Sequence, residues 1–408
     1  MALDPVALTH ASGHASFYNK KAMDLSGVTK NTKDPRGGEI IRDANGEPIG
    51  VFRERAQGLV RRGRTGRQLR RSPAERKEAL RETIRLANRE CLANGVTSFQ
   101  DAGSSFGTIR MFKEMVDQGR INTRLWVMLR TGNRSLARNP DSFRMVGYGN
   151  NHLTVRAIKV SIDGALGPRG AWLLEPYKDL PTSRGLNTVR LESLAETARL
   201  AMKHDYQLCV HAIGDRANRE VLNVFEAAIK ASPDKKDIRW RIEHAQHIDP
   251  DDIPRFGQLG VIASMQGIHC TSDAVYVIAR LGEQRARDGA YVWQSLMKSG
   301  ALVTNGTDAP VEDVNPVASF HATVSRRLKD GSVFFPEQRM SRMEALKSYT
   351  INCARAAFEE DIKGTLTPGK LADVVVLSKD IMRCPEHEIL EAEVVYTIVG
   401  GRVRYKNR

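Results

Sequence analysis

Histidine and aspartate side chains stand where short apolar runs of this sequence end. His211 and His244 each close such a run, and Asp308 closes a third. Imidazole nitrogens and carboxylate oxygens are common ligands of divalent metal ions, and a carboxylate can also accept a proton from water. A lone histidine is more often structural than a ligand. Two histidines at the ends of successive strands, however, would lie side by side, so a structural role and a metal-ligand role stay equally open.

Lys159 lies inside the apolar run 157–163, where a bare ammonium group is costly to bury without a partner. Two explanations stay open. The lysine could pair with a nearby carboxylate such as Asp101 or Asp308. Alternatively, its amine could have reacted with carbon dioxide to form a carbamate, an anionic oxygen donor that can bridge two metal ions.

These residues belong to a regular alternation of strand and helix patterns. Apolar, β-branched runs are followed by helical stretches such as 191–203, 218–231 and 250–259. This alternation predicts parallel strands joined by crossover helices. The seven runs are 96–101, 124–129, 157–163, 208–211, 241–244, 261–265 and 302–308.

Two parallel architectures fit such a pattern, an open doubly wound sheet and a closed barrel. The first usually has a glycine-rich phosphate turn after its first strand, and this sequence has none. In the second, functional residues stand at the carboxyl ends of many strands, as they do here. We therefore predict an α/β protein with a TIM-like (β/α)8 barrel. We find seven runs where eight are needed, so one strand is unaccounted for.

The ends of the chain indicate further units. Residues 1–60 are rich in Gly, Pro, Asn and Asp and look dominated by loops, and Ser72-Pro73-Ala74-Glu75 then predicts a capped helix that stops at Asn94-Gly95. After a helix at 345–357, further strands follow at 372–377, 394–399 and 402–405. We therefore assign residues 1–350 to the barrel, with an N-terminal insertion region at 1–94. Residues 351–408 form a C-terminal helix and part of a small β-sandwich.

Composition narrows the class of protein. The net charge of +14 raises the question of nucleic-acid binding, but its one arginine cluster has no interleaved aromatic residues for base stacking, so we expect a solvated basic segment. No apolar run reaches membrane-spanning length, no signal peptide is recognisable, and the five cysteines show no CxxC pairing. We expect a cytoplasmic protein with reduced thiols. The arginine cluster named above comprises Arg53, Arg55, Arg61, Arg62, Arg64, Arg67, Arg70 and Arg71.

Long motifs in fixed order resemble the amidohydrolase superfamily, and specifically its amidohydrolase-3 (YtcJ-like) metal-dependent hydrolases. The likeness covers essentially the whole chain. The matching segments are His10–His14 with Asn19, Lys159-Val-Ser-Ile-Asp-Gly-Ala-Leu-Gly-Pro-Arg169 with Glu175-Pro-Tyr177, His211-Ala-Ile-Gly-Asp-Arg216, Arg241-Ile-Glu-His-Ala-Gln246, Ala263-Ser-Met-Gln-Gly-Ile-His269, Gly306-Thr-Asp-Ala-Pro-Val-Glu312, Pro336–Arg339 and Lys363–Asp373.

The resemblance implies a role for several residues. Lys159, carboxylated or not, His211, His244 and Asp308 would bind one or two divalent metal ions, with zinc the first expectation, and Asp308 would be the general base. His14 and His269 would line the substrate pocket. Arg169 would hold a substrate carboxylate or pair with Glu175, and Asp373 would mark re-entry into the small β-unit.

One feature of the family is missing. Its first barrel strand ends in a His-x-His pair, and no such pair occurs in these 408 residues. The resemblance therefore implies that the barrel lacks its first strand, and we expect an N-terminally truncated chain. We predict a metal-dependent amidohydrolase that uses metal-activated water to cleave an amide-type, non-peptide C–N bond of a small molecule. The alternative is a catalytically impaired fragment or a non-catalytic binding scaffold of the same fold. A homo-oligomer is compatible with both, whereas nucleic-acid and membrane partners are not expected.

Overall fold

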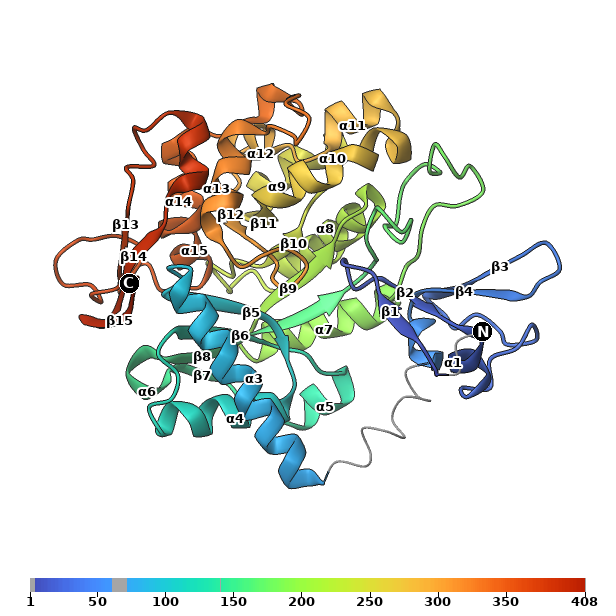
Figure 1. Ribbon diagram of the computed structural model, residues 1–408, viewed down its shortest axis with the longest axis horizontal. Coiled ribbons are helices and arrows are strands. Elements are labelled where there is room, and N and C mark those ends of the chain that lie inside the picture. Colours follow the sequence, from blue (N-terminus) through green and yellow to red (C-terminus); the bar gives the residue numbers. More distant parts are fainter. Residues whose placement is uncertain (1–3, 61–71, 140, 408) are drawn as a thin grey trace.

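The computed structural model describes residues 4–60, 72–139 and 141–407. Its centre, within these ranges, is a curled sheet of seven parallel strands with helices packed around it (Figure 1). All seven predicted strands are therefore confirmed, and a short strand that was not predicted, β7 (Met145–Gly147), pairs antiparallel with β8. The order across the sheet is β12 (Val303–Gly306), β11 (Ile262–Gln266), β10 (Arg241–His244), β9 (Gln207–Ala212), β8 (Leu153–Ser161), β6 (Arg124–Leu129) and β5 (Ser98–Ser104).

The central strands are buried on both faces, which is why their sequences read as continuous apolar runs rather than alternating ones. Every residue of β9 and β10 is buried. Crossover helices cover the outer face, including α7 (Leu191–Lys203) and α8 (Asp215–Lys230), whose predicted positions are confirmed within three residues. A curled parallel sheet with this helical cover fits the TIM-like barrel class.

The remaining helices follow the predicted order with one break. The capping box of α3 is present at Ser72 and Glu75, and its C-cap is Asn94. The helix expected at 345–357 is instead two helices, because Thr350 leaves helical conformation with φ −118° and ψ −94°. The helices are α3 (Pro73–Ala93), α4 (Phe106–Asp117), α5 (Asn133–Arg138), α6 (Tyr148–Asn151), η1 (Pro250–Asp252), α9 (Ile253–Leu259), α10 (Gly267–Leu281), α11 (Glu283–Gly289), α12 (Trp293–Lys298), α13 (Pro316–Ser325), η2 (Pro336–Gln338), α14 (Arg342–Tyr349), α15 (Ile351–Ala356) and η3 (Glu386–Glu391).

The expectation that residues 1–60 are dominated by loops is wrong for the described part. This segment forms a four-stranded antiparallel sheet with a short helix, α1 (Lys20–Asp24), and a small core that contains Tyr18, Ile40 and Phe52. At Gly38 an added Cβ would lie 2.2 Å from the backbone nitrogen of Ala56, so the glycine permits close packing there. The sheet order is β1 (Ala7–Thr9), β2 (Ala15–Tyr18), β4 (Pro48–Glu54) and β3 (Gly38–Arg42).

The two end strands of the parallel sheet, β5 and β12, do not pair with each other in the described chain. The start of α15 contacts both instead. Asn352 donates through Nδ2 to the carbonyl of Val303 at 3.0 Å, and Gln100 donates through Nε2 to the carbonyl of Cys353 at 3.1 Å. The Asn352 side chain thus satisfies one backbone carbonyl of β12, and the Gln100 side chain ties β5 to the backbone of α15.

The C-terminal residues form a three-stranded antiparallel sheet of β13 (Val374–Leu377), β14 (Val394–Val399) and β15 (Arg402–Lys406). Arg124, the first residue of β6, binds Asp373 through Nε at 2.6 Å and Nη2 at 2.9 Å, and both side chains are buried. The same carboxylate accepts from the backbone of Gly400. The predicted structural position of Asp373 at the entry to this unit is confirmed.

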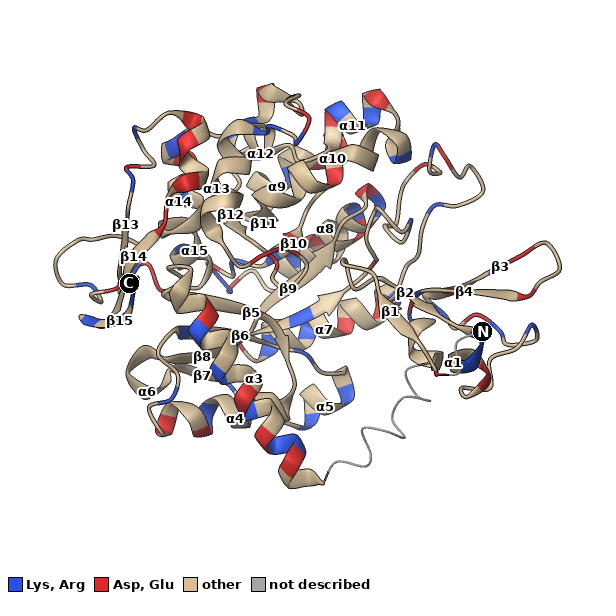
Figure 2. Cartoon of the chain, viewed as in Figure 1, with Lys and Arg blue, Asp and Glu red and all other residues tan. Residues whose placement is uncertain are grey.

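Charge is spread over the surface rather than gathered in one stripe, with acidic and basic residues alternating along the outer helices (Figure 2). Of the arginine cluster, Arg53 pairs with Glu39 at 2.7 Å, and the members from Arg61 to Arg71 lie outside the described residues. No helix in the described ranges is long and apolar enough to cross a membrane.

Candidate metal and substrate site

The carboxyl ends of neighbouring strands bring the predicted histidines together. In the parallel register of β9 and β10, His211 is opposite Glu243 and Ala212 is opposite His244. The His211 and His244 rings meet edge to face with centroids 4.5 Å apart, and both are buried. The prediction that they lie side by side is confirmed.

Two further histidines extend this pair into a row. His14 is the residue just before β2, and the centroid of its ring lies 5.2 Å from the centroid of the His211 ring. The His269 ring, from the first turn of α10, stacks on His244 at 6.2 Å. The row therefore joins the N-terminal unit, two adjacent barrel strands and the helix that follows β11.

His244, His269 and Asp308 form a compact group of metal-ligand type. One potential ligand atom of each lies within 4.8 Å of the other two, and Nε2 of His269 is 3.8 Å from Oδ2 of Asp308. The resemblance implied a pocket-lining role for His269 and a ligand set of Lys159, His211, His244 and Asp308. The structure adds His269 to the residues that can reach the same ion.

Hydrogen bonds orient the two rings of this group. Nδ1 of His244 donates to Oε1 of Gln266 at 2.7 Å, which leaves Nε2 as a lone-pair donor. Nδ1 of His269 contacts Nε2 of Gln246 at 2.9 Å. Burial lowers the pKa of His244 to about 4. The ring is therefore neutral at pH 7, as metal binding requires.

His244 and Asp308 also share an uncommon backbone conformation. Their φ angles are +76° and +57°, in the left-handed region that His, Asp and Asn adopt more often than other residues with a side chain.

Lys159 is buried, with 4% of its surface exposed, and has no hydrogen bond or ion pair among the described residues. Pairing with Asp101 or Asp308, one of the two explanations considered, is not observed. Burial lowers its pKa to about 8, the nearby charge of Arg130 acts in the same direction, and Glu243 opposes it. The uncharged fraction of the amine near neutral pH is therefore larger than for an ordinary lysine.

Asp163 is a site residue that the sequence pattern did not single out. Its buried carboxylate accepts from the backbone nitrogens of Trp172 at 2.9 Å, Ile213 at 3.0 Å and Gly214 at 2.9 Å. Its Oδ1 is 3.4 Å from Nε2 of His211, an atom with no hydrogen bond of its own. Burial raises the pKa of Asp163 to about 7, although the backbone amides oppose this shift. The feature of the sequence that could have identified Asp163 as a site residue is its position four residues after Lys159.

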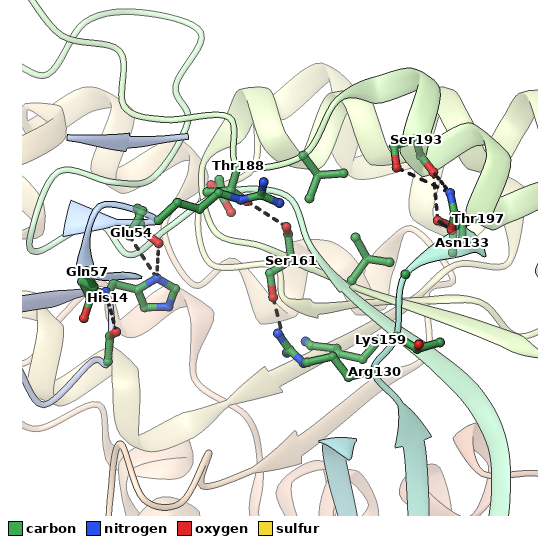
Figure 3. A pocket seen from close by; sticks show the side chains of 17 residues that line it. His14, Glu54, Gln57, Arg130, Asn133, Lys159, Ser161, Thr188, Ser193 and Thr197 are labelled. Carbon is green, nitrogen blue, oxygen red and sulfur yellow. Dashed lines mark hydrogen bonds and ion pairs between the residues drawn. The ribbon is translucent and has the colours of Figure 1, made fainter. Parts of the chain in front are cut away.

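A cavity of about 470 Å³ opens beside Lys159, between the N-terminal unit and the barrel (Figure 3). His14 lines it and binds Glu54 through Nδ1 at 2.9 Å. Burial opposes protonation of His14, but this partner raises its pKa above the ordinary value. Arg169 does not line the cavity. It pairs with Asp179 at 2.7 Å, so the alternative of pairing with Glu175 is not observed.

Comparisons with known proteins agree with this arrangement. A model of the amidohydrolase family matches residues 1–405. The chain is 36% identical to the protein LONG AFTER FAR-RED 3 of Arabidopsis thaliana, over 98% of this chain and 69% of that protein. It is 30% identical to the amidohydrolase YtcJ of Bacillus subtilis (strain 168), over 98% of this chain and 74% of that protein.

A third curated relative has a named reaction. The N-substituted formamide deformylase of Arthrobacter pascens is 27% identical, over 99% of this chain and 74% of that protein. Among solved structures, an uncharacterized metal-dependent hydrolase from Pyrococcus horikoshii superposes with a TM-score of 0.74 at 27% identity, over 94% of this chain and 73% of that one. The sequence motifs, the strand-end geometry and the family match coincide, and the chain belongs to the amidohydrolase family.

Proposed function

We propose that the chain is a metal-dependent hydrolase that cleaves an amide-type, non-peptide C–N bond of a small molecule. The observation that carries this proposal is the group formed by His244, His269 and Asp308 beside the unpaired Lys159. The activity named for the formamide deformylase relative supports the choice of bond.

The residues present fit a divalent cation. Nε2 of His211 is buried without a hydrogen bond, and Nε2 of His244 is left free by the Gln266 contact. Buried imidazole nitrogens without partners cost free energy unless something binds them. We assign His211, His244 and Asp308 as ligands, His269 as an additional ligand, and zinc as the ion, because nitrogen donors with a carboxylate suit zinc.

We also assign Lys159 to the metal site, through a carbamate formed on its amine. An uncharged amine adds to carbon dioxide, a new N–C bond forms, and one proton is released, which leaves an anionic carbamate. The lowered pKa of Lys159 favours the uncharged amine that this addition needs. The carbamate would supply oxygen ligands from the floor of the site, so we propose that Lys159 is carboxylated in the active protein.

Asp308 acts as the general base of the reaction. A cation at this site would polarise the substrate carbonyl and lower the pKa of a water molecule. Asp308 accepts a proton as the water oxygen attacks the carbonyl carbon, and it then returns that proton to the amine nitrogen as the C–N bond breaks. The products are a carboxylic acid and an amine. His14, held by Glu54, is proposed to contact the substrate from the N-terminal unit.

Metal analysis and a substrate panel test this function together. The purified chain is expected to bind about one or two zinc ions and to hydrolyse a member of a panel of N-formyl and N-acyl amides. Asp308→Asn, which keeps an oxygen donor but loses the base, is expected to retain folding and lose turnover. A well-folded protein with neither bound metal nor turnover on the panel would overturn the proposal.

A further inference from the structure

The Glu54 side chain reaches from the N-terminal unit to the barrel. Glu54 is the last residue of β4, yet its carboxylate lies against Gly164 and Gly170, which belong to the loop after β8. Only 7% of this side chain is exposed. A single carboxylate therefore contacts both units of the chain, at the edge of the cavity that they enclose together.

The two glycines leave the space that the Glu54 carboxylate occupies, and we call Gly164 and Gly170 the glycine seat. A Cβ added at Gly164 would overlap the carboxylate, and its three nearest heavy atoms would all belong to that group. A Cβ added at Gly170 would lie 2.6 Å from Oε1 of Glu54. The backbone N–H of Gly164 also donates to the carbonyl of Gly170 at 3.1 Å, so the loop itself holds the seat together.

Glu54 binds His14 at two points. Its backbone N–H donates to the carbonyl of His14 at 2.9 Å. Its carboxylate accepts from Nδ1 of the ring, with Oε1 at 3.0 Å and Oε2 at 2.9 Å (Figure 3). Because Nδ1 is engaged in this way, Nε2 is the ring nitrogen that remains for a ligand.

The orientation of the His14 ring depends on this one partner. Among the described residues, Glu54 is the sole hydrogen-bond partner of the ring, whose other contact is the neighbouring ring of His211. A histidine ring turns about two side-chain bonds, so a ring without Glu54 would populate other orientations. At a reacting centre, a displacement of about 1 Å can cost roughly 100-fold in rate.

We propose that Glu54 is the positioning residue for His14, and that the barrel loop, through the glycine seat, fixes the carboxylate that orients the ring. The proposal rests on the proposed function, in which His14 contacts the substrate. The contacts run from the loop after β8 to Glu54 and from Glu54 to His14. The shape of a barrel loop thus decides how the N-terminal unit presents its histidine to the strand-end site.

Paired substitutions measure whether Glu54 acts through His14. Glu54→Ala is expected to lower kcat/KM for an N-formyl or N-acyl amide by about 10- to 100-fold. Glu54→Gln, whose amide oxygen still accepts from Nδ1, should retain most of the activity. His14→Asn should lose about as much as Glu54→Ala, and the double variant should lose no more than about twofold beyond His14→Asn. An unchanged kcat/KM in Glu54→Ala, or losses that multiply in the double variant, would overturn the proposal.

A substitution in the barrel loop tests the glycine seat itself. Gly164→Ala places a methyl group where the carboxylate lies, and the end of a flexible side chain can move aside without a shift of the backbone. The variant is expected to lose as much kcat/KM as Glu54→Ala, although it changes neither Glu54 nor His14. Gly58→Ala, in the same unit as Glu54, is the matched control, because its added Cβ meets nothing within 4 Å. Parental kcat/KM in Gly164→Ala would overturn the role of the loop.

The ring of His14 can also be observed without any turnover. In protein with isotope-labelled histidine, a proton that Nδ1 donates to a carboxylate gives a downfield NMR signal that exchanges slowly with water, and His14→Asn identifies it. The signal is expected in the parent, Glu54→Gln and Gly58→Ala, and should be lost in Glu54→Ala and Gly164→Ala. This pattern in a chain that cleaves no amide would support the positioning contact while the proposed function fails. A signal that persists in Gly164→Ala would overturn the proposal whatever the activity.

Discussion

Nε2 of His269 lies 3.8 Å from Oδ2 of Asp308, so a residue of α10 meets a residue of the loop just after β12, the last strand of the parallel sheet along the chain. His244 stands beside both. This contact changes the assignment of His269, which by resemblance was a pocket residue and by position is able to act as a ligand.

Removing the His269 ring distinguishes the two roles. If His269 is a ligand, His269→Asn is expected to lower zinc affinity by at least about 10-fold, similar to His244→Asn. Competition with a chromogenic chelator measures this change. His204→Asn, at the end of α7 and outside the cluster, serves as the control. An unchanged zinc affinity combined with a raised KM would show that His269 binds substrate instead.

The hydrogen bond between Gln266 and His244 is expected to affect zinc affinity, although Gln266 is not itself assigned as a ligand. Oε1 of Gln266 accepts from Nδ1 of His244 at 2.7 Å and so orients the ring. Gln266→Leu removes this acceptor and is expected to weaken zinc binding by about 10- to 100-fold. Gln266→Glu keeps an oxygen there and should retain most of the affinity. Equal affinities for the Leu and Glu variants would contradict an orienting role.

Lys159 should destabilise the metal-free protein at neutral pH. Its pKa falls from 10.5 to about 8 in the folded state, so the folded chain holds the proton less tightly than the unfolded chain. The penalty, about 3 kcal/mol, is fully present below pH 8 and disappears as the pH rises to 10.5. Lys159→Met is therefore expected to raise the free energy of unfolding by up to that amount.

Urea unfolding at pH 7 in the presence of a chelator measures this effect. Lys203→Met, on the exposed end of α7, is the matched control and should change stability by less than about 0.5 kcal/mol. A Lys159→Met protein no more stable than the parent at pH 7 would mean that the buried amine has a stabilising partner.

Carboxylation of Lys159 predicts a pH dependence of activation. With a pKa of about 8, the uncharged fraction of the amine rises from about 10% at pH 7 to about 90% at pH 9. At fixed concentrations of dissolved carbon dioxide and zinc, the rate of activation should rise across this range and level off above it. Stopped samples assayed at one fixed pH measure the rate. A rate that is flat between pH 7 and 9 would count against the carbamate.

The buried pair of Arg124 and Asp373 should hold the C-terminal sheet onto the barrel. Asp373→Ala leaves a buried guanidinium without its partner and is expected to cost about 3–5 kcal/mol. The double variant Arg124→Met, Asp373→Leu removes both charges and should be clearly more stable than the single variant. Thermal unfolding measures both. Equal losses in the two proteins would show that packing, rather than the charge pair, sets the stability.

Much of the barrel was predictable because its signals are local. The ends of α3 follow from Ser72, Glu75 and Asn94, which bond to backbone groups within one turn. The strands β9 and β10 follow from apolar runs that suit burial on both faces. The N-terminal sheet was not predictable in this way, since its short strands, such as β1 and β2, depend on pairing with each other.

The sequence by itself determined which side chains stand at the strand ends, and hence that His211, His244 and Asp308 face one site. Only the tertiary structure decided which groups meet there. The curl of the sheet and the path of α10 bring His269 to Asp308, and the N-terminal unit brings His14 to His211. Likewise, the unpaired amine of Lys159 follows from what the fold places around it. Secondary-structure propensity depends on a few neighbouring residues. The distances between side chains on different strands depend instead on strand register and on packing across the whole chain.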